Sequence, residues 1–290
     1  MIYFGNVRES IDYLAIGHLT IDRHPRGDRP GGTVRFAAGV ASKLGARIGV
    51  VTSAHQDTAA DGWIGPGASC ALKPSKNTTS FRNIYERAGR RQVLKRTACR
   101  IGMSDAPAHW REARVIHLAP LVGEIDPGEV EVCPAGSLRC GTLQGWLRTW
   151  DANEGTVRPS THPRLLEYIE CFDAIVVSTE DLAGLESTER ALVSRARLIA
   201  VTKGAAGADL WSDGRPLGQV QALPVQVLDP TGAGDVFAAA FFLQLAAGQD
   251  PLEAARYACC AASLSTVGEG IAAIADDKTI RFWLDRGFAM

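Results

Sequence analysis

Short apolar runs that alternate with helical patterns are the feature of this sequence that most restricts its fold. Residues 13–17, 47–52, 115–119, 174–178 and 198–202 each form such a run, bounded by polar residues or glycine. A strand that is apolar throughout suits a sheet whose two faces are both covered. Because strands alternate with helices, we predict an α/β fold with a doubly wound, mostly parallel sheet flanked by helices.

The segments between these runs predict helices and a second kind of strand pair. Residues 34–44 are rich in alanine and indicate a helix, and residues 110–114 and 163–171 are expected to be crossover helices. Residues 208–211 and 220–227 are expected to pair as a more exposed hairpin.

One stretch departs from this pattern. Residues 78–97 alternate polar and apolar side chains around Ala88-Gly89, which is typical of a β-hairpin with one wet face. We expect this hairpin to project from the core, with residues 22–31 as one further edge, and to form a small β lid. The whole chain, residues 1–290, is predicted to be a single domain, whose least regular part is residues 122–145.

Composition excludes several classes of protein. The net charge of −1 gives no basic excess for nucleic acid. No apolar run approaches the ~20 residues that a membrane span needs, and the first residues lack the pattern of a signal peptide. The 7 cysteines are odd in number and lack CxxC spacing, so neither a disulfide framework nor a zinc site is indicated. We therefore expect a cytoplasmic protein that binds neither nucleic acid nor membrane.

The string Asp-Pro-Thr-Gly-Ala-Gly-Asp at 229–235 directly precedes an apolar helical stretch. Glycines where a loop enters a helix leave backbone N–H groups and the positive end of the helix dipole facing one spot, which suits an anion such as phosphate. Asp235 lies in the first turn of that helix, where its carboxylate can accept a proton from a hydroxyl that attacks phosphorus. The alternative is a glycine-rich loop that merely begins a buried helix.

This string resembles the C-terminal signature of the ribokinase-like (PfkB) family of carbohydrate and nucleoside kinases. The resemblance implies that Asp235 is the catalytic base and that the backbone of Gly232, Ala233 and Gly234 forms the anion hole for the transferred phosphoryl group. It also implies a ribokinase-like fold with a lid over the sugar, ATP as the phosphoryl donor, and Mg²⁺ bridging phosphate oxygens.

The resemblance also assigns a substrate side. Asp22 would bind the sugar, and Gly31 and Gly32 would let the backbone approach it closely; the alternatives are a solvated turn aspartate and a plain turn before a helix. The family usually carries an Asn four residues after the second glycine, whereas this chain has Phe36. This departure predicts a different substrate or a differently built pocket.

A donor side follows from the same resemblance, with the nucleotide beside Thr202, Gly204, Gly207, Thr231 and Gly268. Glu180 would act on the metal indirectly, through water. The competing interpretations are a common strand–loop glycine, a helix N-terminus at Ser178-Thr-Glu-Asp, and a helix stop at Gly268. Of the histidines, His117 is expected to be a satisfied core residue, whereas His18 lies nearer the predicted pocket.

The sequence thus predicts a carbohydrate kinase that uses ATP to phosphorylate a hydroxyl of a small polyol or sugar. Residues 31–36 and 121–125 and the small lid look more like the inositol-kinase and general sugar-kinase branches than like ribokinase proper. A cyclic polyol such as myo-inositol is therefore the first candidate and a nucleoside the second. Phe81 or Tyr85 on the hairpin could stack on a base or cover a sugar face, so these aromatics do not decide between the two candidates.

Two functions of other classes compete with the kinase. One is a non-catalytic sensor that binds nucleotide or sugar, against which the intact Asp235 argues. The other is an α/β oxidoreductase, which the absence of GxGxxG after the first strand disfavours. No GxxxxGK[ST] is present, so a P-loop kinase is not indicated. The protein is expected to be a monomer or a homodimer, because lid hairpins can pair between subunits.

Overall fold

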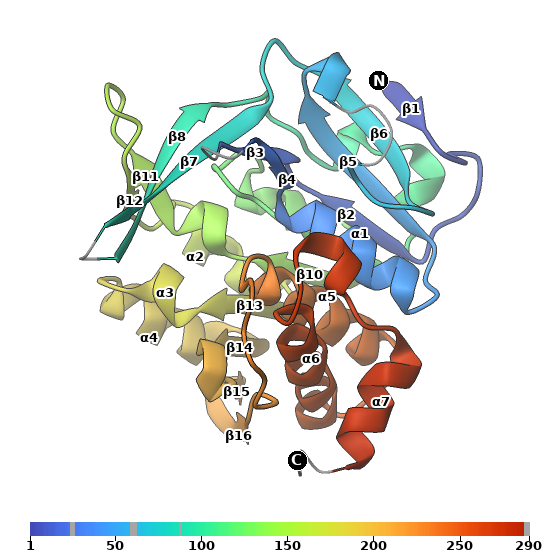
Figure 1. Ribbon diagram of the computed structural model, residues 1–290, viewed down its shortest axis with the longest axis vertical. Coiled ribbons are helices and arrows are strands. Elements are labelled where there is room, and N and C mark those ends of the chain that lie inside the picture. Colours follow the sequence, from blue (N-terminus) through green and yellow to red (C-terminus); the bar gives the residue numbers. More distant parts are fainter. Residues whose placement is uncertain (24–26, 59–62, 87–88, 287–290) are drawn as a thin grey trace.

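A ten-stranded sheet runs through the computed structural model, which describes residues 1–23, 27–58, 63–86 and 89–286 (Figure 1). The strands follow the order β1 (Ile2–Phe4), β6 (Ser69–Pro74), β5 (Ile48–Ala54), β2 (Tyr13–Ile16), β9 (Val115–Leu118), β10 (Leu138–Thr142), β13 (Ala174–Ser178), β14 (Leu198–Thr202), β15 (Ala208–Ser212) and β16 (Arg215–Val220). Neighbours from β6 to β14 are parallel, and the remaining pairs are antiparallel. The predicted doubly wound, mostly parallel sheet is confirmed.

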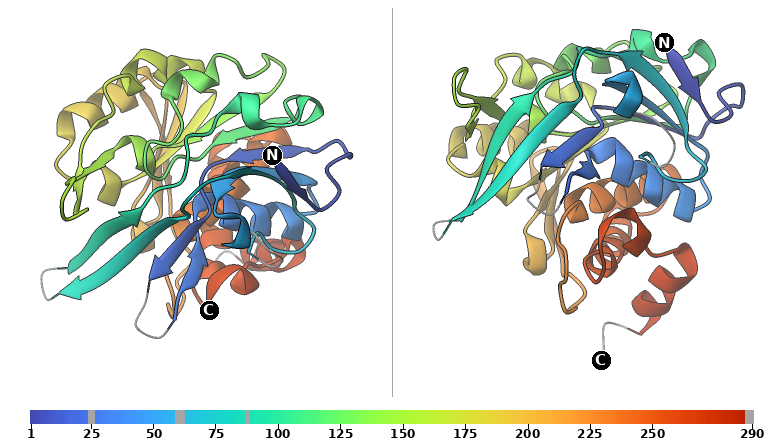
Figure 2. Two further views of the ribbon diagram at one scale, coloured as in Figure 1. Left: turned by 90° about the horizontal axis from the view of Figure 1, so that it is seen from above. Right: turned by 45° about the horizontal axis from the view of Figure 1, so that its top comes forward.

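Helices cover both faces of this sheet (Figure 2). One face carries α1 (Thr33–Lys43), α5 (Ala233–Ala246) and α6 (Pro251–Ser265), with α7 (Asp277–Asp285) packed on α6; the other carries α2 (Leu165–Tyr168), α3 (Thr179–Leu182) and α4 (Glu186–Arg195). Alternate side chains of β2 enter the two cores, since Tyr13 and Ala15 face α5 whereas Leu14 and Ile16 face the opposite layer. Two-sided burial is why these strands read as continuous apolar runs.

The connections depart from prediction in two places. Residues 110–114 form no crossover helix; the chain makes only a 3₁₀ turn at Ala108–Trp110, which seats the fully buried Trp110 in the core. The predicted strand at 220–227 is also wrong, because the partner of β15 is β16, which ends at Val220. Five of the six residues of β16 are exposed, so its sequence lacks the apolar pattern of the inner strands.

Strand β10 was missed altogether, although it lies near the middle of the sheet between β9 and β13. It falls within residues 122–145, the part predicted to be least regular. Its sequence is Leu-Arg-Cys-Gly-Thr, and small residues are needed here because a side chain on Gly141 would press on the ring of Phe172. Close packing therefore removed the apolar signal of a central strand.

A second, four-stranded sheet projects over the carboxyl edge of the main one, in the order β4 (Arg29–Gly31), β3 (Thr20–Arg23), β7 (Thr79–Glu86) and β8 (Gly89–Arg96) (Figure 1). We call it the lid sheet. It is drawn from the two segments expected to form the lid, apart from residues 24–26 and 87–88, which lie outside the described residues. Its action as a lid stays a prediction.

A hairpin of β11 (Arg148–Trp150) and β12 (Val157–Pro159) joins the outer edge of β8. The Leu94 N–H donates to the Gly155 carbonyl at 2.8 Å, and Val93 forms an antiparallel bridge with Thr156. Phe81, 3% exposed, packs beneath this junction with Leu94 and Val122. The ring of Phe81 is therefore part of a small core, which conflicts with the expectation that it faces a substrate.

No helix in the described ranges is both long and apolar enough to cross a membrane. The cytoplasmic location inferred from the cysteines stays a prediction.

The contact between the hairpin and the lid sheet can be tested at Gly155. This residue has φ +73°, and an added Cβ would collide with the carbonyl oxygen of Leu94. Overpacking of this kind typically destabilises by about 1–3 kcal/mol. We expect Gly155→Ala to lower the free energy of unfolding, measured in urea, by about 2 kcal/mol more than the control Gly248→Ala. Gly248 has φ +84° but open space around it, so the control carries the backbone strain alone. Equal losses in the two variants would contradict the contact.

Candidate active site

The amino terminus of α5 lies at the carboxyl edge of the sheet and carries the residues of the 229–235 string. Gly232 caps the helix in the left-handed conformation, with φ 80°. The preceding loop is fixed because the N–H groups of Leu228 and Asp229 both donate to the Thr266 carbonyl. The Ala233 N–H donates at 3.2 Å to the Pro230 carbonyl and closes a turn. The amides of Gly234 and Asp235 therefore head the first turn, where helical N–H groups have no partner within the helix.

Asp235 is partly exposed and is held by a hydroxyl from another helix. Its Oδ1 accepts a hydrogen bond of 2.8 Å from Oγ1 of Thr33, the first residue of α1. Burial raises the pKa of Asp235 to about 6; the Thr33 hydrogen bond opposes the rise, the charge of Asp181 adds to it, Arg148 opposes it and Asp22 adds to it. A carboxylate with a pKa near neutrality suits the transfer of a proton.

Asp22, Gly31 and Gly32 lie together at the base of the lid sheet. An added Cβ on Gly31 would lie 2.9 Å from Oδ2 of Asp22 and equally close to Oγ1 of Thr20. Gly32 has φ +103°, and a side chain there would strike the His18 carbonyl. The Gly-Gly pair thus makes room for the Asp22 carboxylate and lets the chain turn into α1.

Phe36, which replaces the asparagine typical of the resembled family, is 4% exposed. Its ring lies directly against Gly232, so that any Cβ on Gly232 would overlap the ring carbons. The side chain therefore packs under the cap of α5 rather than presenting a polar group to a ligand. A glycine is required at position 232 both for its positive φ and for the space that Phe36 occupies.

Of the two carboxylates on α3, Asp181 is the one whose charge acts on the pKa of Asp235. Glu180 is exposed. Asp181 accepts hydrogen bonds from the Ser178 hydroxyl at 2.6 Å and the Gln144 amide at 3.2 Å, and its charge raises the pKa of Asp235. Ser178 also caps α3 by accepting from the Asp181 N–H. The sequence offered the string at residues 178–181 both as a helix start and, through Glu180, as an indirect metal site, and it did not single out Asp181.

The residues predicted for the donor side begin at the same edge, where Thr202 ends β14 and Gly204 starts a 3₁₀ turn; Gly207, Thr231 and Gly268 lie on loops. Gly204 is exposed with open space beside it, whereas Gly207 is buried with φ +85°, and a side chain there would strike the Val220 carbonyl. Gly207 thus has a structural reason to be glycine that is independent of any nucleotide. Thr231 is exposed, and its N–H donates to Asp229. Thr202 and Gly268 are partly buried.

Both histidines considered from the sequence are buried. His117 bonds to the Tyr13 hydroxyl at 2.9 Å and to the Thr142 hydroxyl at 3.1 Å, and burial lowers its pKa to about 3. It is the satisfied core residue that we expected. His18 donates from Nε2 to the Cys99 carbonyl at 2.9 Å, because a carbonyl can only accept, and its Nδ1 bonds to Thr79 Oγ1 at 2.7 Å. His18 therefore ties the segment after β2 to the lid sheet, and these two bonds account for both of its ring nitrogens.

The loop after β9 is organised by a buried carboxylate. Glu124, 3% exposed, accepts hydrogen bonds from the backbone N–H groups of His18, Leu121 and Val122 at 3.1, 2.9 and 2.7 Å. Three amide donors replace the water that the charge loses on burial. The 121–125 string, noted from its likeness to inositol kinases, is thus a structural clamp on this loop.

Arg148 connects that loop with the lid sheet. Its Nε donates to the Leu121 carbonyl at 2.6 Å, its Nη1 donates to Gln92 of β8 at 2.9 Å, and its guanidinium lies 5.1 Å from the ring centre of Phe81. Its charge also lowers the pKa of Asp235. Sequence reasoning missed Arg148, and it missed Thr33 although that residue directly follows the Gly-Gly pair.

Comparison with known proteins agrees with this geometry. The model of the pfkB family carbohydrate kinases matches residues 152–278, a stretch that contains Asp181 and the whole 229–235 string. The predicted resemblance to ribokinase-like (PfkB) kinases is confirmed, and with it the class of enzyme, a carbohydrate kinase.

Relatives and solved structures extend the likeness over most of the chain. A cytidine kinase of Thermococcus kodakarensis is 26% identical over 84% of this chain and 91% of its own length. A pyrophosphate-dependent kinase of the ribokinase family, solved with a pyrophosphate analogue and myo-inositol, is similar with a TM-score of 0.75 and 21% identity, over 89% of this chain and 96% of that one. Ribokinase of Arabidopsis thaliana, solved with ribose and ATP, has a TM-score of 0.72 and 20% identity over 95% and 99% of the two chains. These structures confirm the ribokinase-like fold.

The environment of Asp235 predicts how its removal affects stability. Its pKa of about 6 in the folded protein lies above its ordinary value of 3.8, so the folded state prefers the protonated carboxyl. The stabilisation from this preference is complete below pH 3.8 and is lost as the pH rises through 6. We expect Asp235→Asn, which stays uncharged, to melt about 2 °C above wild type at pH 8 but not at pH 4. The control Asp285→Asn, at an exposed position of α7, should show no such dependence. A melting-temperature difference that is constant between pH 4 and pH 8 would contradict the environment described for Asp235.

Proposed function

We propose that this chain, which has the fold and the carboxy-terminal sequence match of the ribokinase-like (PfkB) carbohydrate kinases, transfers the terminal phosphoryl group of ATP to a hydroxyl of a small polyol or sugar. One observation carries the proposal. The Asp235 carboxylate, with its pKa raised to about 6, lies in the same helical turn as amides that suit a phosphate.

In this reaction the acceptor oxygen forms a bond to the terminal phosphorus while the bond from that phosphorus to the donor's bridging oxygen breaks. The proton of the acceptor hydroxyl passes to Asp235, which is why the ionised carboxylate is the active form. The N–H groups at the start of α5 stabilise the charge on the phosphoryl oxygens. The Ala233 N–H would first have to break its 3.2 Å hydrogen bond to the Pro230 carbonyl. The N–H groups of Gly234 and Asp235 are therefore the more accessible donors.

Asp22 is proposed to hold hydroxyls of the acceptor, with Gly31 and Gly32 allowing the backbone close to it. The acceptor is proposed to be a polyol or sugar, and a cyclic polyol such as myo-inositol is the first candidate. The Phe36 ring supports an altered acceptor pocket, because it removes the amide that the resembled family places there. The lid sheet would then exclude water, which competes with the acceptor hydroxyl.

The nucleotide is proposed to lie along Thr202, Gly204, Gly207, Thr231 and Gly268. Three exposed apolar side chains support a nucleotide donor: Val227, Leu228 and Val267, whose exposed fractions are 54%, 67% and 49%. The Leu228 N–H donates to the carbonyl of Thr266, the residue directly before Val267, so this bond connects the two segments that carry the exposed side chains. An apolar surface beside the 229–235 loop can pack against the planar base of a nucleotide.

Mg²⁺ fits this site as a companion of the donor phosphates rather than as a resident ion. Within the described residues, no group of three or more His, Cys, Asp and Glu side chains could hold a metal alone. Mg²⁺ is commonly held by one or two carboxylates together with substrate phosphates and water. Asp181 is the carboxylate we propose for this role, with the exposed Glu180 at most acting through water. When bound, the ion would neutralise charge on the phosphates.

A nucleoside acceptor is the second candidate, because the cytidine kinase is similar over most of both chains. A non-catalytic sensor of nucleotide or sugar remains the alternative of another class. It gives no reason for a carboxylate beside a phosphate site.

Turnover tests these alternatives directly. Purified protein is incubated with Mg²⁺ and either ATP or inorganic pyrophosphate, against a panel of polyols, sugars and nucleosides, and phosphorylated product is measured. We expect product from ATP and a polyol or sugar, and a loss of kcat by about 10²–10⁴-fold in Asp235→Asn. Product from nucleosides alone would select the second candidate, and product from pyrophosphate alone would replace the donor. Nucleotide binding without product from any acceptor would support the sensor.

Gly234 tests the phosphate position without disturbing the fold. An added Cβ there meets no atom within 4 Å, so Gly234→Ala should unfold within about 0.5 kcal/mol of wild type. If phosphate lies over the first turn of α5, the methyl group displaces it, and we expect kcat/KM to fall about 10²-fold. The matched control is Gly136→Ala, at an exposed glycine that also has open space. Full activity in Gly234→Ala would place the phosphate elsewhere.

A further inference from the structure

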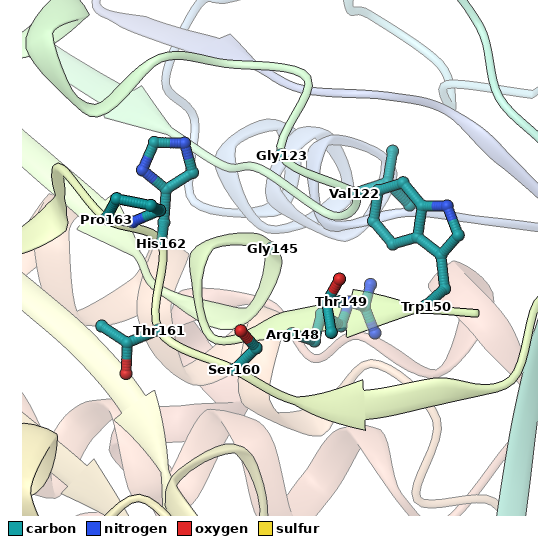
Figure 3. Close-up of a pocket in the computed structure, with 10 residues that line it drawn as sticks. All are labelled: Val122, Gly123, Gly145, Arg148, Thr149, Trp150, Ser160, Thr161, His162 and Pro163. Carbon is teal, nitrogen blue, oxygen red and sulfur yellow. The ribbon is translucent and has the colours of Figure 1, made fainter. Parts of the chain in front are cut away.

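A pocket of about 220 Å³ lies where the loop after β9, the hairpin β11–β12 and residues 160–163 meet (Figure 3). Its lining contains Arg148 and Val122 but none of the residues at the start of α5 or at the base of the lid sheet. The volume is well below the ~300–1,000 Å³ of sites for drug-sized ligands. The pocket therefore suits a small molecule, of the size of a phosphate group with a few carbon atoms.

Each of the polar side chains that line this pocket can donate a hydrogen bond. Arg148 carries a permanent positive charge, and the hydroxyls of Thr149 and Ser160 point toward the space between His162 and Trp150 (Figure 3). No aspartate or glutamate is among the ten residues of the lining. A wall with a cation and several donors but no carboxylate favours a ligand with negatively charged oxygens.

His162 adds a donor whose direction is fixed by its surroundings. The backbone N–H of Arg164 donates to Nδ1 of His162 at 3.2 Å. The neutral ring must then carry its proton on Nε2. Thr161, by contrast, turns its hydroxyl away from the pocket, toward the Thr188 hydroxyl 2.5 Å away. His162 and Ser160 are thus the donors from this segment that a ligand could use.

Arg148 links the pocket to the lid sheet. The same guanidinium that lies in the wall donates to the Leu121 carbonyl and to Gln92 of β8. Trp150, also in the wall, packs with Phe81 and Leu94 in the small core beneath the lid sheet. A ligand in the pocket would therefore contact the hairpin that supports the lid.

We propose that this pocket is a binding site for a small phosphorylated molecule, separate from the position of the transferred phosphoryl group. The anion site itself follows from the donors in its wall. The further inference that the ligand is a phosphorylated polyol, the chemical class of the reaction's product, rests on the proposed function.

Calorimetric titration tests the proposal without any phosphoryl donor. The probes are inorganic phosphate, ribose 5-phosphate and ribose, each titrated into wild type and into His162→Phe and Ser160→Ala. We expect both phosphates to bind wild type, ribose 5-phosphate more tightly, and each variant to weaken them about tenfold, as the loss of a hydrogen bond to a charged group does. The control His109→Phe removes an exposed histidine, bonded to the Val7 carbonyl, that lies outside this lining, and it should bind like wild type.

The outcomes separate this proposal from the kinase assignment. Equal binding of both phosphates would identify free phosphate as the occupant and keep the anion site. Phosphate binding that neither His162→Phe nor Ser160→Ala weakens would put the anion elsewhere and overturn the proposal, as would tighter binding of ribose than of the phosphates. Because no donor is present, the titration result stands whether or not the protein turns over any acceptor.

Discussion

The hydrogen bond between Thr33 and Asp235 joins the first turns of two helices that lie 200 residues apart in the sequence, and the site depends on it. Both helices begin at the carboxyl edge of the parallel sheet, so their N–H groups and dipoles face the same region. The carboxylate is kept at that electropositive edge although burial disfavours its charge. Burial raises the pKa of Asp235 to about 6, so the carboxyl can exchange a proton near neutral pH.

Phe36 is a departure from the family pattern whose structural role can be seen in the fold. From the sequence, it was known only that the asparagine amide usual in the family is absent at this position. In the fold its ring fills the space beside Gly232 and thereby supports the turn from which the phosphate-facing amides project. The substitution therefore changes the acceptor side of the pocket and the packing of the helix cap together, because one side chain serves both.

The inner strands and the α5 amino terminus could be predicted because their signals are local: unbroken apolar runs, and glycines before a helix. Strand β10 could not be predicted, because the small residue Gly141 is required by its packing against Phe172, which lies 31 residues further along the chain. Asp181 and Arg148 were missed for a similar reason. Both act on Asp235 through their charges although they are distant from it in the sequence. The resemblance to the family pointed to Glu180, the residue next to Asp181, instead. His18, which the sequence placed near the predicted pocket, bonds to the carbonyl of Cys99, 81 residues away, a contact that no local pattern reveals.

The β11–β12 hairpin has a consequence for how copies of the chain could associate. Strand β8 would otherwise offer an open row of N–H and C=O groups, but Gly155 already takes the Leu94 N–H. At the opposite margin, β4 is three residues long and contains Pro30, which has no N–H to give. The hairpin therefore covers part of the β8 edge, and Pro30 removes one donor from the β4 edge, so each border of the small sheet offers a shorter row of backbone groups to a second strand.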